Sequence, residues 1–321
     1  MPRGKGSPPI VSRTGWRRLQ DRLGGRVMAV MAAGAALLVL VMVAALLVRA
    51  WPILRCKPLG ELLLGTSWHP LKGAFGFRPF IVGTLWVTAL AMVIAVPLCT
   101  LCAICLAEYA RPKVQRAAKP LIDLLAGIPS VVYGVWGMLT VVPLIREHVG
   151  PWADRHLGHV PFFSTAANPT GYGVLAGGIV LAVMVFPIII SVMEEVLCSV
   201  PDGLREATLA LGVTRWIMVR KVVLRRALPG VIAAVVLGFS RAFGETMAVL
   251  MVVGNVPQAP RSIFDAAYPL TALIANNYGE MMSVPLYDAA LMGAGLFLLL
   301  VVLGFNLLAR LILRRATRRA M

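Results

Sequence analysis

The sequence contains six long, mostly apolar stretches separated by short polar segments. A helix rises 1.5 Å per residue, so about 20 apolar residues are needed to cross the roughly 30 Å hydrocarbon core of a membrane. Only 14% of the residues are charged and 59% are hydrophobic, which excludes a soluble globular domain and a disordered chain. We therefore predict an all-α, polytopic membrane protein with six transmembrane helices, at residues 27–48, 80–107, 120–145, 173–193, 228–253 and 289–309.

Basic residues are distributed unevenly among the polar segments. Seven, four, six and five Lys and Arg residues occur in segments 1–26, 108–119, 194–227 and 310–321. The alternate segments 49–79, 146–172 and 254–288 hold five, two and one. Because basic segments stay on the cytoplasmic side of a membrane, we expect both termini and segment 194–227 there. The net charge of +17 is then explained by membrane topology. We expect the basic residues to face lipid headgroups and not to bind nucleic acid.

This topology divides the chain into regions. The first apolar run is too long for the core of a cleaved signal peptide, so we expect it to stay as an anchor. The expected regions are a cytoplasmic basic tail (1–26), transmembrane helix 1 (27–48), an extracytoplasmic loop (49–79), a core of five transmembrane helices (80–309) that includes the cytoplasmic loop 199–227, and a second basic tail (310–321).

Three of the five cysteines, Cys99, Cys102 and Cys105, lie together in one apolar stretch. Their spacing superficially resembles a run of iron–sulfur ligands, but no nearby fourth thiol or histidine completes a set. An odd number of cysteines also predicts no disulfide framework. We interpret them as small apolar residues of a membrane helix and expect no metal site.

Segment 199–227 is typical of two short helices joined by a turn. Ser199, three residues before Asp202, matches a capping box. Gly212 is suited to end the first helix, and Thr214 to cap the second. Such an amphipathic pair can lie on anionic lipid headgroups or fill a groove on a partner protein, and the residues alone leave both possibilities open.

The sequence Glu206-Ala207-Thr208, followed after three residues by Gly212, resembles the EAA coupling loop of ABC importer permeases. In that family a separate ATPase moves the membrane helices through this loop. The resemblance implies that Arg205, Glu206, Ala207 and Gly212 lie at the ATPase contact. The chain departs from the consensus at Thr208, Val222 and Arg225.

The fifth apolar stretch contains the only charged residues that fall well inside a predicted span, Arg241 and Glu245, four residues apart. On a continuous helix they would share one face. Intramembrane charges are costly and typically mark a transport route, so we assign Ser240, Arg241, Glu245 and Thr246 to a translocation pathway or its gate. A structural ion pair is the alternative. The planar guanidinium of Arg241 suits an oxyanion such as phosphate or sulfate.

The third apolar stretch contains a predicted helix break at Gly127, Pro129 and Ser130. Proline removes a helical hydrogen bond and frees backbone groups, which can line a cavity in a transporter. A kink that serves packing alone is the alternative.

Three strings together carry a more specific resemblance: AGIPSVVYG at 126–134, RAFGETMAV at 241–249 and VVGN at 252–255. They are similar to the permease subunits of the bacterial phosphate-specific transport system, and to the C type (PstC) more than to its sister, the A type (PstA). The resemblance implies a type I ABC importer permease in the bacterial plasma (inner) membrane that imports inorganic phosphate and catalyses no covalent reaction.

The same resemblance implies the partners. They are a homologous PstA-type permease, a PstB-type ATPase dimer and a periplasmic or lipid-anchored PstS-type phosphate-binding protein. The chain lacks the Gly-x-x-x-x-Gly-Lys-Ser/Thr phosphate loop, so we expect it to bind no cofactor and its ATPase partner to hold ATP and Mg. The alternatives are the sister permease, a sulfate or molybdate ABC permease, a secondary transporter and a phosphate-sensing membrane scaffold.

Overall fold

A computed structural model describes residues 12–166, 168–280 and 283–320. The first 11 residues of the expected N-terminal tail lie outside this part of the chain. The helices are α1 (Ser12–Cys56), α2 (Leu59–Leu64), α3 (Arg78–Ile104), α4 (Pro112–Ala126), α5 (Ser130–Trp136), α6 (Val142–Leu144), α7 (Gly150–Leu157), α8 (Val174–Cys198), α9 (Asp202–Ala210), α10 (Arg215–Met218), α11 (Leu224–Phe243), α12 (Met247–Leu250), α13 (Leu270–Asn277) and α14 (Tyr287–Ala320).

Shorter elements complete the described chain. Strands β1 (Trp68–His69) and β2 (Ala74–Phe75) form a small antiparallel pair. Turns of 3₁₀-helix occupy Pro70–Lys72 and Pro161–Phe163. Turns of π-helix occupy Cys105–Tyr109, Gly137–Val141, Ile145–Val149 and Val219–Val223.

The helices confirm the predicted all-α membrane fold. Within the described ranges, five helical stretches are long and apolar enough to cross a membrane: Arg22–Cys56, Arg78–Tyr109, Val174–Cys198, Arg215–Phe243 and Tyr287–Leu311. A sixth span is formed if Pro112–Ala126 and Ser130–Leu157, which meet at 91°, are counted together. The third span, expected at 120–145 with a break at Gly127, Pro129 and Ser130, is therefore bent at those residues.

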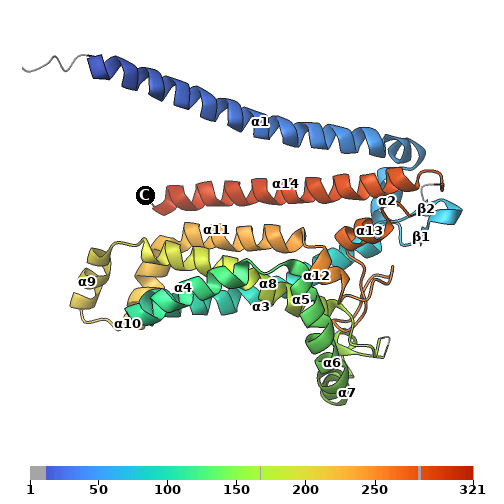
Figure 1. Ribbon diagram of the computed structural model, residues 1–321. Helices are drawn as coiled ribbons and strands as arrows, with labels where there is room; N and C mark the ends of the chain where they lie inside the picture. The colour runs from blue at the N-terminus through green and yellow to red at the C-terminus, as the bar shows by residue number, and fades with distance from the viewer. Residues whose placement is uncertain (1–11, 167, 281–282, 321) are drawn as a thin grey trace, which may run out of the picture.

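Helix α8 is the centre of the bundle and packs against α3, α4 and α11 (Figure 1). A stripe of small residues on α3 allows it to approach α8 closely: Ala91, Ala95, Cys99 and Ala103 are all fully buried. On α8, a Cβ atom added to Gly178 would lie only 2.8 Å from the Leu90 side chain of α3. Because lipid offers little hydrophobic driving force between helices, this close packing is a main source of their association.

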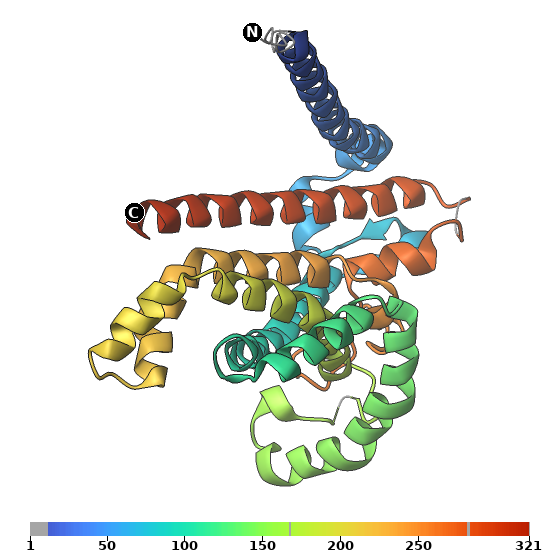
Figure 2. The same ribbon diagram turned by 60° about the vertical axis from the view of Figure 1, so that its left-hand side comes forward.

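Helix α1 is the outermost element. Near its C-terminal end Ala50 and Ile53 are buried against α14, where Gly293 leaves room for them. Its preceding turns diverge from the other helices (Figure 2). The helix continues to Cys56, so the expected loop 49–79 begins with two further helical turns.

The two ends of the molecule carry different elements. The start of α1, the end of α14 and the pair α9–α10 lie at one end (Figure 1). The strands, α2 and α13 lie at the other. The described parts of the two basic tails, 12–26 and 310–320, thus lie at the same end as the loop 199–227.

We predict that Ala95→Leu lowers the thermal unfolding midpoint of the purified chain in detergent, because its side chain would be forced into the fully buried α3–α8 contact. Overpacking of this kind costs about 1–3 kcal/mol. Ala89→Leu is the matched control, since Ala89 is exposed on the same helix. Equal midpoints for the two variants would contradict the close contact.

Candidate functional site

A helix interruption separates α4 from α5 at the predicted residues. α4 ends at Ala126, Gly127 follows it, and Pro129 precedes the first residue of α5, Ser130. Proline disfavours helical backbone at the residue before it, which explains the position of the break. The bend at these residues is thus confirmed, whereas their role in lining a pathway stays a prediction.

Tyr133 braces this interruption. Its hydroxyl donates a 2.8 Å hydrogen bond to the carbonyl oxygen of Leu125, in the last turn of α4. The same carbonyl accepts a longer, 3.3 Å bond from the Ile128 amide. The neighbouring Gly134 lets α5 contact α12, because a Cβ atom there would lie 3.1 Å from Ala248 Cα. The start of α5 is therefore held against both α4 and α12.

A second interruption lies between α11 and α12. The helix expected at 228–253 ends at Phe243, and α12 begins at Met247. Glycine at 244 disfavours continued helix, and the next two side chains bond to nearby backbone. Glu245 Oε1 accepts from the Ala248 amide at 3.4 Å, and Thr246 Oγ1 donates to the Gly244 carbonyl at 3.4 Å. Such local bonds compete with helix.

This break overturns the expectation that Arg241 and Glu245 share one face of a continuous helix. Arg241 lies in the last turn of α11, and Glu245 lies beyond the helix end. Both residues are described, and no ion pair joins them. Neither side chain is buried, and Arg241 is exposed on the surface of the single chain.

Arg241 adjoins both interruptions. It lies in the last turn of α11, before the second break, and α12 on the far side of that break packs against α5, which begins at the first. Ser240 instead donates its hydroxyl to Asn306 Oδ1 of α14, at 3.1 Å. Of the residues assigned to the pathway, Arg241 therefore offers guanidinium N–H groups at an exposed position, whereas the hydroxyls of Ser240 and Thr246 already donate within the chain.

The segments around the second break are connected by hydrogen bonds between threonine hydroxyls and backbone groups. Thr271 Oγ1 of α13 donates to the Glu245 carbonyl at 2.9 Å, and Thr84 Oγ1 of α3 accepts from the Leu270 amide at 3.0 Å. Gly254 and Asn255, in the quoted VVGN string, both have positive φ, of 89° and 52°. A glycine and an asparagine tolerate this left-handed backbone, which starts the turn back toward α13.

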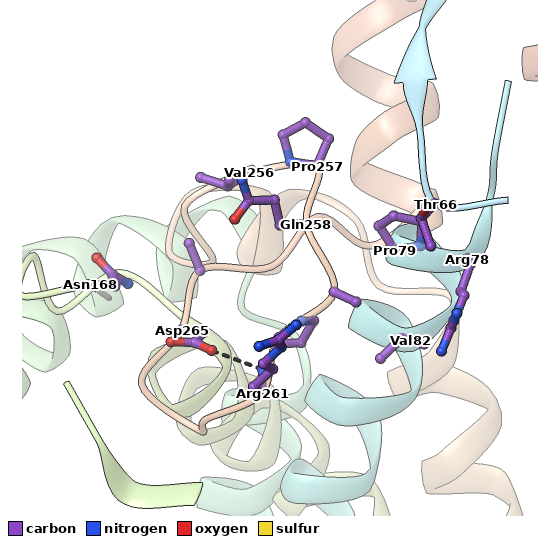
Figure 3. Close-up of a pocket in the computed structure, with 13 residues that line it drawn as sticks. Thr66, Arg78, Pro79, Val82, Asn168, Val256, Pro257, Gln258, Arg261 and Asp265 are labelled. Atoms are coloured by element: carbon purple, nitrogen blue, oxygen red, sulfur yellow. Dashed lines mark hydrogen bonds between the residues drawn. The ribbon is translucent and has the colours of Figure 1, made fainter. Parts of the chain in front are cut away.

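A cavity of about 780 Å³ opens at the end of the molecule opposite α9 and α10. Arg78 at the start of α3 and Arg261 from the loop before α13 both line it (Figure 3). Asp265 is already engaged, because its carboxylate accepts the backbone amides of Arg261 and Ser262 at 2.8 and 2.9 Å. Within the described part of the chain neither guanidinium has an acidic partner, so the cavity wall is basic.

The loop 199–227 forms the expected pair of helices around a tight turn. Gly212, with φ of 78°, supplies the left-handed residue between α9 and α10. Thr214 caps α10 by accepting the Ile217 amide at 3.4 Å. The capping box at Ser199 is wrong, since Ser199 caps the end of α8 and donates to the Val196 carbonyl. We call α9, Gly212 and α10 together the elbow.

The four predicted coupling residues of the elbow do not all face the same way. Glu206, Ala207 and Gly212 are exposed, and their contact with an ATPase stays a prediction. Arg205 turns inward, with only 15% of its side chain exposed, and forms a 2.9 Å ion pair with Glu108. Burial lowers the pKa of Arg205, but hydrogen bonds and charges from Glu108 and Asp202 outweigh it and hold that pKa above its usual value.

Comparison with known proteins identifies the family. The sequence profile of the binding-protein-dependent transport system inner membrane component matches residues 95–320. This chain belongs to that family. Two phosphate transport system permease proteins, both PstC, are similar along most of their length. The protein of Haemophilus influenzae is 38% identical over 288 residues, covering 87% of this chain and 90% of its own. The protein of Xylella fastidiosa is 39% identical over 256 residues, covering 79% and 78%.

A solved structure supports the fold of this permease. A bacterial ABC transporter involved in the import of the acidic polysaccharide alginate gives a TM-score of 0.57 at 16% identity, covering 93% of this chain and 99% of the other. The expected ABC importer permease fold and the PstC-type family are thus confirmed. Members of this family are multi-pass inner-membrane subunits that work with an ATPase and a binding protein.

Several residues of these regions were missed by sequence reasoning. Glu108 is the first residue of the basic segment 108–119, a position typical of an exposed interfacial residue. No motif indicates that Tyr133 bonds to the Leu125 carbonyl, and none marks the basic cavity, because Arg78 and Arg261 come from distant segments. Only the π-helical turn around Glu108 and the fold itself bring these groups to their places.

We predict that Tyr133→Phe destabilises the permease by about 1 kcal/mol, because the Leu125 carbonyl loses its shorter hydrogen bond. The measurement is the thermal unfolding midpoint of the purified chain in detergent. Tyr278→Phe serves as the control, since the Tyr278 side chain is exposed. If both variants unfold at the wild-type temperature, Tyr133 does not brace the break.

Proposed function

We propose that this permease is the membrane subunit of an ATP-driven importer that translocates inorganic phosphate across the bacterial plasma membrane. One observation carries the proposal: Arg241 is an exposed cation at the end of α11, next to two interruptions of membrane helices. The two PstC relatives, which are named for phosphate transport, support the choice of substrate.

The chemistry of Arg241 suits this substrate. A guanidinium is planar, stays charged at any physiological pH and donates paired hydrogen bonds to an oxyanion. In a membrane such a charge is costly unless it faces water, an anion or another protein. The nearby Glu245 carboxylate repels anions, which would keep phosphate from being held too tightly to leave.

The proposed partners are a PstA-type permease, a PstB-type ATPase dimer and a PstS-type phosphate-binding protein. The sister permease would cover the face that bears Arg241 and the two breaks. The ATPase, which would hold ATP and Mg, would contact the elbow at Glu206, Ala207 and Gly212. The distribution of basic residues supports a cytoplasmic position for the elbow and both termini.

In this scheme the basic cavity lined by Arg78 and Arg261 lies on the extracytoplasmic side, where the binding protein delivers phosphate. Closure of the ATPase dimer would then move the elbow and rock the membrane helices between outward-facing and inward-facing states. The chain itself would make or break no covalent bond.

The proposal is tested by uptake of radiolabelled phosphate at low micromolar concentration, in cells that lack this chain and in cells in which it is restored. We expect restoration to recover uptake that a large excess of unlabelled sulfate does not reduce. Strong competition by sulfate would indicate a sulfate permease, whose substrate suits the same guanidinium. Uptake that does not depend on the chain would contradict the proposed function.

We predict that Arg241→Ala reduces the initial rate of phosphate uptake at least about 30-fold, the effect of losing a desolvated charge contact worth 2 kcal/mol or more. Amounts of inserted permease and of co-purified ATPase should stay at the wild-type level. Arg116→Ala is the control, because Arg116 is an exposed arginine at the start of α4. Wild-type uptake by the Arg241→Ala variant would contradict a role for Arg241 in phosphate translocation and would favour a structural role.

A further inference from the structure

The two helices of the elbow are attached to the membrane helices in different ways. α10 and the π-helical turn after it bury Met218, Val219 and Val223 in the core around α8. α9 has no buried residue. Because α9 buries none of its own residues, packing holds it to the bundle only weakly, and polar contacts are the main connection between them.

Arg205 supplies these contacts. Its Nε and Nη2 donate to Glu108 Oε1, at 3.2 and 2.9 Å. Nη2 also donates to the Leu197 carbonyl in the last turn of α8, at 2.8 Å, and Nη1 donates to the Val200 carbonyl just beyond it. One guanidinium from α9 therefore binds both the π-helical turn that continues α3 and the end of α8.

The π-helical turn Cys105–Tyr109 places Glu108 for this contact. The buried stripe on α3 runs at intervals of four residues through Ala95, Cys99 and Ala103. Ile104, beside the stripe, is also buried, and Glu108 follows it by four residues. The wider π turn brings Glu108 into line with Ala103 as well. The Glu108 side chain is only 2% exposed as a result.

A second arginine binds the same turn from the other half of the elbow. Arg215, the first residue of α10, lies with its guanidinium carbon 5.1 Å from the centre of the Tyr109 ring. Arginine over an aromatic face is attracted to the ring's electrons. The end of α3 is thus contacted from both sides of the Gly212 turn.

We propose that the Arg205–Glu108 ion pair is the mechanical link that passes movement of the elbow to α3 and α8. Arg205 and Glu108 are positioning residues in this inference, which rests on the proposed function of the elbow as the ATPase contact. A displacement of α9 reaches the ends of two packed membrane helices through one rigid, multiply bonded side chain. Without the pair, α9 would move with the ATPase while the bundle stayed behind.

The test compares ATP hydrolysis with phosphate import by the complete transporter, assembled with its partner permease, ATPase and binding protein in proteoliposomes. We expect Glu108→Gln to hydrolyse ATP at a rate near wild type but to import at least tenfold less phosphate for each ATP. Both rates are normalised to the permease that carries bound ATPase, so partial loss of assembly does not alter the ratio. A residue that only stabilises the fold would leave this ratio unchanged.

Loss of one charge leaves the other buried and unpaired, which can impair folding. The double variant Glu108→Gln with Arg205→Met removes both charges, and we expect it to assemble well and to show the same low ratio. Asp202→Asn is the matched control, because Asp202 contacts the same guanidinium through a side chain that is 87% exposed. It should keep the wild-type ratio.

The outcomes separate the two proposals. Wild-type import for each ATP by the double variant would overturn the link. Absence of ATP-dependent phosphate import by the unchanged transporter would instead contradict the proposed function. Glu206→Lys provides a further comparison, since it should release the ATPase, whereas the Glu108 variants should retain it.

Discussion

The absence of water in the membrane core governs this fold. A backbone amide or carbonyl that leaves a helix there needs another partner inside the protein. The permease nevertheless interrupts two of its membrane helices, and side chains from other segments compensate. Tyr133 binds a carbonyl at the end of α4, Thr271 binds the Glu245 carbonyl after α11, and Thr84 binds the first amide of α13. These three bonds make irregular backbone possible around Arg241.

Rigid and adjustable regions are separated in the bundle. α3 and α8 are in contact along a stripe of small residues, and such contacts tolerate little sliding because each side chain fills a matching space. The interruptions lie on α4–α5 and α11–α12, beside this pair and outside it. In an alternating-access movement, α3 and α8 would therefore move together as a rigid unit, and the two helix breaks beside them would serve as hinges.

The general architecture could be predicted from the sequence, because the length of each apolar stretch indicates a membrane span and the distribution of basic residues indicates which loops share a side. The break at Pro129 could also be predicted, because proline disrupts a helix through its own backbone, which lacks an N–H group. The end of α11 was not predicted, because residues 228–253 have the length and mostly apolar character of one span. Gly244 and the local hydrogen bonds of Glu245 and Thr246 together end the helix there. The position of Glu108 could not be predicted for another reason. A single π turn changes the helix face that each later residue occupies, and the sequence does not indicate the turn.

Helix α1 has a consequence for how the protein is made. None of its most apolar 18-residue window is buried by the rest of the molecule, although its mean hydropathy is 2.8. Its transfer from the translocation machinery into lipid thus depends on no other helix being present, as in the first stage of two-stage membrane protein folding. Basic residues precede it. α1 can therefore enter lipid before any helix pair of the bundle exists.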